Sequence, residues 1–196
     1  IRAESVLRIG SAELAFAAIS ALAARIRYAA AEGADGVVVT QGTDTLEETA
    51  FLLDRLVETD IPVVVTGAMR NAGHPGADGL ANLLSAVRVA ASPVACGVGT
   101  LVVMNDEIHL ARFVRKGHAT STATFESPQL GAVGWVAEGR VRIPLVPRHR
   151  ARRFDVPDGV AFPQIALVKL SLGDSPRLIE LIDTDTFAGA VVEPYD

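Results

Sequence analysis

The sequence predicts an α/β fold with a parallel sheet of flavodoxin or Rossmann type, followed by the start of a smaller α/β domain. Short β-branched runs, at 37–40 and 62–66, alternate with amphipathic stretches that have helical periodicity. The connections between them are short, which favours parallel strands with helices on both faces of the sheet. Ligands of such sheets bind beyond the carboxyl ends of the strands, where the polar loops 41–45 and 67–76 are expected.

The first helix is predicted to run from Ser11, a preferred N-cap residue, to about Ala31, just before Gly33. Further helices are expected at about 46–58 and 79–91, and a further strand at about 98–104. Residues 105–127 are polar and irregular, and a loop of this length inside a compact domain suggests a function. A β-hairpin is predicted at 133–143, with Glu138-Gly139 at its turn.

The pattern divides the chain into an α/β domain at 1–143, a linker at 144–163 and the start of a second α/β domain at 164–196. The linker is rich in proline and arginine. The second domain is expected to contain a strand, a helix and a final strand. Because Ile1 is not a start methionine and the last strand ends the sequence, we expect the chain to be truncated at both ends.

Composition narrows the classes of partner. The chain has 196 residues, 49% of them hydrophobic, a formal net charge of -5 and a pI near 5.4. This mild acidity gives no electrostatic footprint for nucleic acid, so a small soluble ligand is favoured. No apolar run is long enough to span a membrane. The sequence does not distinguish a cytoplasmic from a periplasmic location.

Metal and disulfide sites are not predicted. Cys96 is the single cysteine, which excludes an intrachain disulfide and a cysteine-based zinc site. The four histidines lack the spacing of metal ligands. We therefore expect neither a metal nor another cofactor.

The most informative stretch runs from Gly36 to Thr49, where a β-branched strand meets a tight turn and then the start of a helix. The first N–H groups of such a helix are unpaired and suit an anion or a developing oxyanion. Capping is the alternative, because Thr45 and Glu48 have the spacing of a capping box. One cap is enough for one helix, so Thr43 and Asp44 remain available for a ligand, on a turn where Gly42 allows a close approach.

Lys116 is one of only two lysines in a chain that otherwise uses arginine for positive charge. The structural alternative is a solvated surface lysine, since most lysines are exposed. In favour of a chemical role, a desolvated lysine can lose its proton at working pH, which arginine cannot. Lys116 is therefore a candidate base.

These motifs resemble those of the bacterial asparaginase and glutaminase family. The segment 41–45 followed by 47–50 resembles the second family signature, and the segment 112–116 with 123–125 resembles the one that bears the catalytic lysine. Further similar motifs occur in the same order at 67–70, 77–79, 82–83 and 102–106. The departures are Gln41 where the family usually has histidine, Phe113 and Arg115 where it has aspartate and threonine, and Ala12 where secreted members commonly have glutamine.

The resemblance implies hydrolysis of the side-chain amide of L-asparagine by a threonine nucleophile, with L-glutamine as a second candidate substrate. It implies catalytic roles for Thr43, Asp44 and Lys116, with Asp44 also binding the substrate α-ammonium. Ser11 would bind the α-carboxylate, and backbone groups near Gly42 and Ala68 would surround the amide. The family's first nucleophilic threonine belongs to a segment outside this sequence.

The resemblance also implies a homotetramer built as a dimer of dimers. Two other functions remain open on the residues alone. One is an amidotransferase subunit that supplies ammonia for tRNA-dependent amidation, for which a basic RNA-facing domain would be the distinguishing feature. The other is a non-catalytic module that binds an amino acid.

Overall fold

The computed structural model describes residues 1–149, 152–157 and 160–194. The chain divides into two compact units, Ile1–Asp158 and Gly159–Asp196, each described here by itself. Residues 150, 151, 158 and 159 of the predicted linker, and residues 195 and 196 of the predicted second domain, lie outside the described residues.

The first unit is built on one six-stranded mixed sheet with the order β1-β2-β3-β4-β7-β8. Strands β1, β2 and β3 are parallel, with Val38 opposite Val64 and Val64 opposite Leu101. From β3 onward the pairing is antiparallel. The predicted α/β fold with parallel strands is confirmed, and antiparallel strands extend its sheet. The six strands are β1 Val37–Thr40, β2 Val63–Thr66, β3 Thr100–Met104, β4 Glu107–Leu110, β7 Gly134–Ala137 and β8 Arg140–Arg142.

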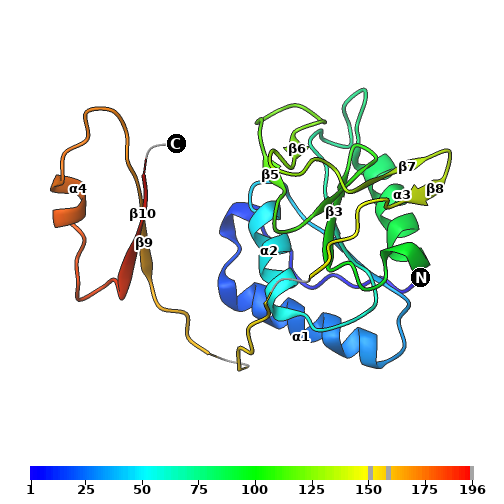
Figure 1. The fold of residues 1–196 in the computed structure, drawn as a ribbon, viewed down its shortest axis with the longest axis horizontal. Coiled ribbons are helices and arrows are strands. Elements are labelled where there is room, and N and C mark those ends of the chain that lie inside the picture. The colour runs from blue at the N-terminus through cyan, green and yellow to red at the C-terminus, as the bar shows by residue number, and fades with distance from the viewer. Residues whose placement is uncertain (150–151, 158–159, 195–196) are drawn as a thin grey trace. The chain divides into compact units, whose positions relative to one another are not determined.

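Helices cover both faces of this sheet, as predicted (Figure 1). Helices α1 (Phe16–Ala31) and α2 (Leu46–Leu56) pack on one face, and α3 (Gly79–Ala90) packs on the other. Successive strand side chains point to opposite faces. Val63 and Val65 of β2 therefore join the cluster of α1 and α2, while Val64 joins that of α3. No described helix is both long enough and apolar enough to cross a membrane.

The first helix begins later than predicted. Ser11 lies in a 3₁₀ turn, Ser11–Glu13, and α1 starts only at Phe16 after Ala15. Leu14 and Ala15 have extended backbone, with ψ of 134° and 158°, and Leu14 packs against the core beneath α1. The partly buried Leu14 thus lies in an extended stretch between the 3₁₀ turn and α1, and Ser11 is not the N-cap of α1.

The irregular segment expected at 105–127 contains three short strands, so this prediction is wrong in part. It contains β4 and a small antiparallel hairpin made by β5 (Arg115–Lys116) and β6 (Phe125–Glu126). Asn105 and Asp106 form the tight turn from β3 to β4, with φ of 51° and 62°. Asn and Asp tolerate this left-handed conformation better than most residues do, but an Asn-Asp turn is a weaker signal than Asn-Gly.

The hairpin predicted at 133–143 is confirmed as the pairing of β7 with β8. Glu138 and Gly139 both have positive φ, 52° and 74°, as a two-residue type I′ turn requires. This hairpin completes the antiparallel side of the sheet.

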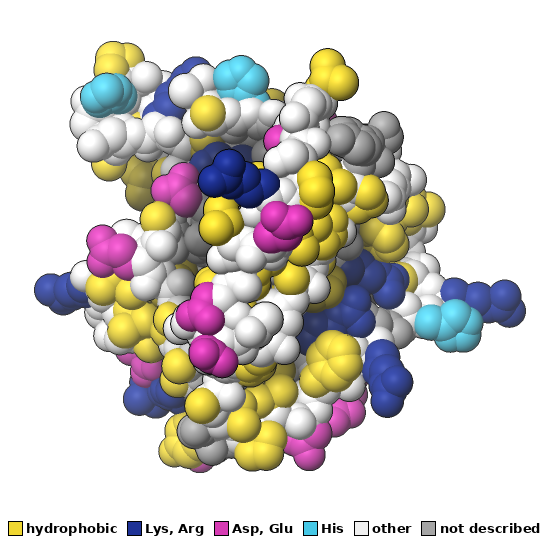
Figure 2. All heavy atoms as spheres, turned by 90° about the vertical axis from the view of Figure 1, so that its left-hand side faces the viewer, with side chains coloured by type: hydrophobic (Ala, Val, Ile, Leu, Met, Phe, Trp, Pro, Cys, Tyr) yellow, Lys and Arg dark blue, Asp and Glu magenta, His cyan; other side chains and the backbone are white. Residues whose placement is uncertain are grey.

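The second unit contains two parallel strands, β9 (Ile165–Lys169) and β10 (Gly189–Glu193), with the short helix α4 (Arg177–Glu180) between them in sequence. Among its described residues no hydrophobic side chain is fully buried. Leu167, Leu172 and Leu181 are at least 70% exposed. In Figure 2, where this unit faces the viewer, hydrophobic side chains lie among acidic ones.

Candidate functional site

The loops that follow β1 and β2 meet at one edge of the sheet. The backbone N–H of Gln41 donates to the carbonyl of Thr66 at 3.1 Å, so the parallel pairing continues to the end of both strands. A Cβ atom at Gly67 would lie 2.5 Å from the carbonyl oxygen of Gln41 and 3.3 Å from Cγ2 of Thr43. Only glycine allows this approach. The two polar loops therefore form one surface, as the predicted sheet requires.

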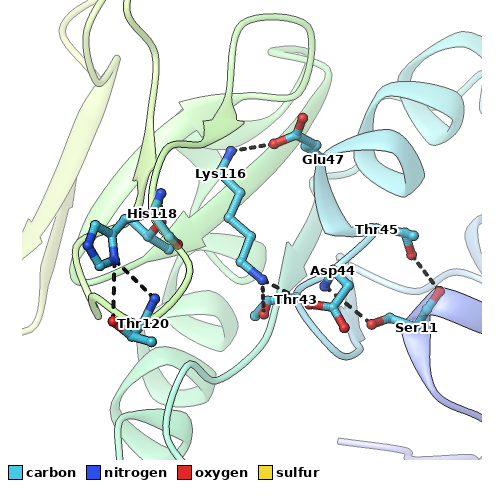
Figure 3. A network of polar contacts seen from close by, with 9 residues as sticks. Ser11, Thr43, Asp44, Thr45, Glu47, Lys116, His118 and Thr120 are labelled. Carbon is cyan, nitrogen blue, oxygen red and sulfur yellow. Dashed lines mark hydrogen bonds and ion pairs between the residues drawn. The ribbon is translucent and has the colours of Figure 1, made fainter.

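Thr43, Asp44 and Lys116 lie together on this surface (Figure 3). Nζ of Lys116 donates to Oγ1 of Thr43 at 2.9 Å and lies 3.0 Å from Oδ1 of Asp44. The Thr43 residue is 9% exposed and the Lys116 side chain 18%, whereas the Asp44 side chain is 67% exposed. A shielded hydroxyl and amine thus lie beside a carboxylate that faces outward, although 73 residues separate Lys116 from Thr43.

Ser11 packs directly against the same turn. Its Oγ accepts the backbone N–H of Asp44 at 3.2 Å, and the residue is 6% exposed. A Cβ atom at Gly42 would lie 2.6 Å from that Oγ. Glycine at position 42 therefore allows the serine to reach the turn.

The predicted capping box is wrong. Thr45 stands at the N-cap position of α2, but its side chain makes no cap hydrogen bond. Its hydroxyl donates instead to the carbonyl oxygen of Ser11 at 2.8 Å (Figure 3). The hydroxyl of Thr45 thus fastens the Ser11 turn to the start of α2.

Ala68 lies in the loop after β2. Two polar residues hold this loop in place, one directly before α3 and one within α3. The carboxylate of Asp78 accepts the backbone N–H groups of Met69 and Arg70 at 2.9–3.1 Å. Nδ2 of Asn82 donates to the carbonyl of Gly67 at 3.0 Å and to Asp78 at 3.0 Å. The peptide groups on both sides of Ala68 are therefore oriented by α3.

Asn82 also connects this loop to the next turn. Its Oδ1 accepts the backbone N–H of Asn105 at 3.0 Å. In the sequence, Asp78 and Asn82 stand out only as parts of family motifs, without a role of their own. Their spacing of four residues, which places them on one face of a helix, was the available signal.

Two buried polar side chains of the first unit do not join the cluster. Nε2 of Gln41, the residue that replaces the usual histidine, is buried and has no hydrogen-bond partner among the described residues. His109 is buried in β4, with Nδ1 3.0 Å from Oγ of Ser127, and burial lowers its pKa. Within the ranges that the structure describes, no three His, Cys, Asp or Glu side chains are grouped to bind a metal.

Comparison with known proteins identifies the family. Residues 1–148 match the family model described as asparaginase, N-terminal. The chain belongs to the asparaginase family. The predicted resemblance is thereby confirmed for the part of the chain that carries the cluster around Thr43.

The asparaginase-family chain is similar to curated bacterial relatives. It is 46% identical over 139 residues to "L-asparaginase 2" of Bacillus subtilis (strain 168), which covers 70% of this chain and 37% of that protein. It is 39% identical over 171 residues to "Glutaminase-asparaginase" of Pseudomonas fluorescens biotype A, covering 85% of this chain and 47% of that protein. The chain thus spans less than half the length of these relatives.

A solved structure shows the same fold. The crystal structure of a probable cytoplasmic L-asparaginase from Campylobacter jejuni matches 96% of this chain and 62% of that chain. The TM-score is 0.91 at 33% sequence identity. The α/β architecture of this asparaginase-family chain, with its mixed sheet, is therefore that of a known family fold.

The Asp78 contacts predict a pH-dependent contribution to stability. Partial burial raises the pKa of Asp78, but hydrogen bonds from the backbone N–H groups of Met69, Arg70 and Asp78 itself and from the Asn82 amide together outweigh it, so its pKa lies below the ordinary value. A lowered pKa adds stability that is present above the unfolded-state pKa of about 4 and is lost as pH falls through the folded-state value. Asp78→Asn should therefore unfold at lower urea concentration than the unmodified protein at pH 7. The difference should shrink steadily below about pH 4.

Asp35, an exposed carboxylate in the turn before β1, provides the control, and Asp35→Asn should leave this pH dependence unchanged. Urea midpoints measured from pH 7 to pH 2.5 test the prediction. A gap between Asp78→Asn and the unmodified protein that stays constant over this range would contradict it.

Proposed function

We propose that the complete protein hydrolyses the side-chain amide of L-asparagine to L-aspartate and ammonia. The observation that carries the proposal is the contact of Lys116 Nζ with Thr43 Oγ1 beside the Asp44 carboxylate. The names of the relatives support the same substrate, since they are L-asparaginases. L-Glutamine is a second candidate substrate, because one relative is named a glutaminase-asparaginase.

In this proposal Lys116 is the base that activates a threonine hydroxyl. Its Nζ lies 2.9 Å from Oγ1 of Thr43, within hydrogen-bond distance. As a free amine it accepts the hydroxyl proton, and the oxygen becomes a nucleophile. The resemblance implies two threonines in the reaction, one of them outside this sequence. Within this chain the proposal therefore rests on Thr43.

The substrate's α-groups are assigned to Asp44 and Ser11. Oδ1 of Asp44 contacts Lys116, and its largely exposed carboxylate can accept the α-ammonium as well. Oγ of Ser11 already accepts the N–H of Asp44, so its hydroxyl hydrogen can be donated to the α-carboxylate. Backbone groups of Gly42 and Ala68 are proposed to surround the amide, where N–H donors would stabilise the developing oxyanion.

We also propose the domain division and the assembly. Residues 1–143 would form the catalytic domain and 164–196 the start of a second one, joined by a linker at 144–163. A homotetramer, as a dimer of dimers, is what the family resemblance implies, and exposed apolar side chains on the outer face of α3 offer a surface for one interface. Leu80, Leu83 and Leu84 there are 85%, 38% and 50% exposed, and such groups of side chains commonly mark interfaces.

Multi-angle light scattering on the full-length protein measures this assembly directly. The expected mass is four times that of one chain. Leu80→Glu combined with Leu84→Glu should lower the mass by placing charge on the outer face of α3, whereas Phe51→Glu, on the exposed side of α2, serves as the control. A stable, active monomer of the unmodified protein would contradict the proposal.

A pair of threonine variants separates catalysis from stability at the central turn. Thr43→Ala should abolish ammonia release from L-asparagine with little change in melting temperature, because it removes the reacting hydroxyl. Thr45→Ala should retain turnover but lose about 0.5–1.5 kcal/mol of stability, the usual value of one hydrogen bond, here the one to Ser11.

Both variants remove one small hydroxyl two residues apart, so general disturbance of the turn would affect them alike. Ammonia release and thermal unfolding are measured on each. If Thr43→Ala turned over substrate at the normal rate, the catalytic role would be wrong. If the unmodified protein bound L-asparagine without turnover, a non-catalytic binding module would be the better conclusion.

Replacement of Lys116 distinguishes a base from a simple positive charge. Lys116→Arg keeps the charge but cannot lose its proton, so it should be nearly as inactive as Lys116→Met. The expected loss in kcat is about 10² to 10⁴, the range of general acid–base catalysis. Lys169→Arg, at an exposed surface lysine, provides the control. If Lys116→Arg kept a kcat close to that of the unmodified protein, Lys116 would act only through its positive charge.

A further inference from the structure

Glu47 contacts Lys116 from the first turn of α2. Its carboxylate accepts the backbone N–H of Lys116, across 69 residues of sequence (Figure 3). The residue is half-buried. Glu47 therefore links α2 to strand β5 through the backbone of Lys116.

With this contact, the short segment 43–47 contacts Lys116 at both its backbone nitrogen and its side-chain amine. Thr43 and Asp44, just before α2, contact Nζ, while Glu47, one helical turn later, contacts the backbone nitrogen. The lysine side chain between these points is a flexible four-carbon stem. Fixing both of its ends relative to α2 limits the conformations that the stem can adopt, so the position of Nζ depends on the bond from Glu47.

The strand that carries Lys116 has few other connections. Strands β5 and β6 have two residues each and, among the strands that the structure describes, pair with each other alone. Phe125, opposite Lys116, is buried in the core, and Gly117 donates its N–H to the carbonyl of Thr124 at 2.8 Å. These contacts hold the hairpin together and anchor β6. Glu47 is the described side chain that connects the backbone of Lys116 itself to α2.

We propose that Glu47 is a positioning residue that sets Lys116 against Thr43. The inference rests on the proposed function, because it assigns Glu47 an effect on the reaction through Lys116. Glu47 contacts no reacting atom. Loss of its carboxylate would leave the side chains of Thr43 and Lys116 chemically unchanged, but it would displace the lysine amine from the threonine hydroxyl.

The first test compares three variants of the full-length protein. Glu47→Ala should lower kcat for ammonia release by about 10- to 100-fold, since a displacement near 1 Å can cost about 10²-fold, while KM changes little. Glu47→Gln should retain most of kcat, because its amide oxygen can accept the same N–H. Glu48→Ala removes a neighbouring carboxylate of the same helical turn, which interacts with Lys116 by charge and not by a hydrogen bond, so it should lower kcat much less than Glu47→Ala does.

The second test asks whether Glu47 acts through Lys116. In a Lys116→Met background, Glu47→Ala should cause no further loss of kcat, because the amine that it positions is already gone. Amide hydrogen exchange of Lys116, followed by NMR, should become faster in Glu47→Ala than in Glu48→Ala. This measurement reports on the contact without depending on activity.

The outcomes are distinct. Normal kcat in Glu47→Ala, equal losses in Glu47→Ala and Glu48→Ala, or a full further loss in the Lys116→Met background would each overturn the positioning role. No ammonia release from the unmodified protein would overturn the proposed function and this inference with it. Turnover without a Glu47 effect would overturn only the inference.

Discussion

The parallel pairing of β1 with β2 is the constraint on which the candidate site depends. In-register pairing from Val37 to Thr40 brings the ends of both strands to one edge, and the bond from Gln41 to Thr66 continues it into the loops. Alternating side chains of the same strands fill two separate cores, one under α1 and α2 and one under α3. A shift of one residue would exchange those faces, so core packing fixes the register and hence the position of Thr43.

Three distant parts of the chain contact the start of α2. Ser11 reaches it through the space left by Gly42, Lys116 reaches it from β5, and the loop after β2 approaches it at Gly67. Several of the hydrogen bonds that join these parts are made by short polar residues of the turn itself. A carboxylate such as Glu47 in the first turn is also favourable for the helix dipole, so its role toward Lys116 does not conflict with helix stability.

The supporting contacts on α3 show how a fold can orient a loop that has no regular structure. Asp78 and Asn82 together bind backbone groups of Gly67, Met69, Arg70 and Asn105. These bonds satisfy polar groups that a partly buried loop would otherwise leave unpaired. They also explain physically why an Asp-Gly pair, an asparagine and an Asn-Asp turn occur together in the motifs, since they form one connected network.

Local patterns were sufficient to predict β1, β2, helices α2 and α3, most of α1 and the turn at Glu138-Gly139, because periodicity and turn chemistry act over a few residues. The same patterns indicated Thr43, Asp44 and Lys116 as candidates. They failed where a nonlocal contact competed with a local one. Ser11 and Thr45 both have good N-cap side chains, yet each makes its hydrogen bond to the other's segment, 33 or 34 residues away.

The sequence by itself determined the α/β class, the order of most elements and the residue types at the central turn, since these follow from hydrophobic periodicity and backbone preference. Only the tertiary structure decided which polar groups meet. The contact of Lys116 with Thr43, the bond from its backbone to Glu47 and the antiparallel strand β4 depend on sheet pairing and on the burial of Phe125 and Ile108. Such pairings are set by packing across the whole core, which no short window of sequence contains.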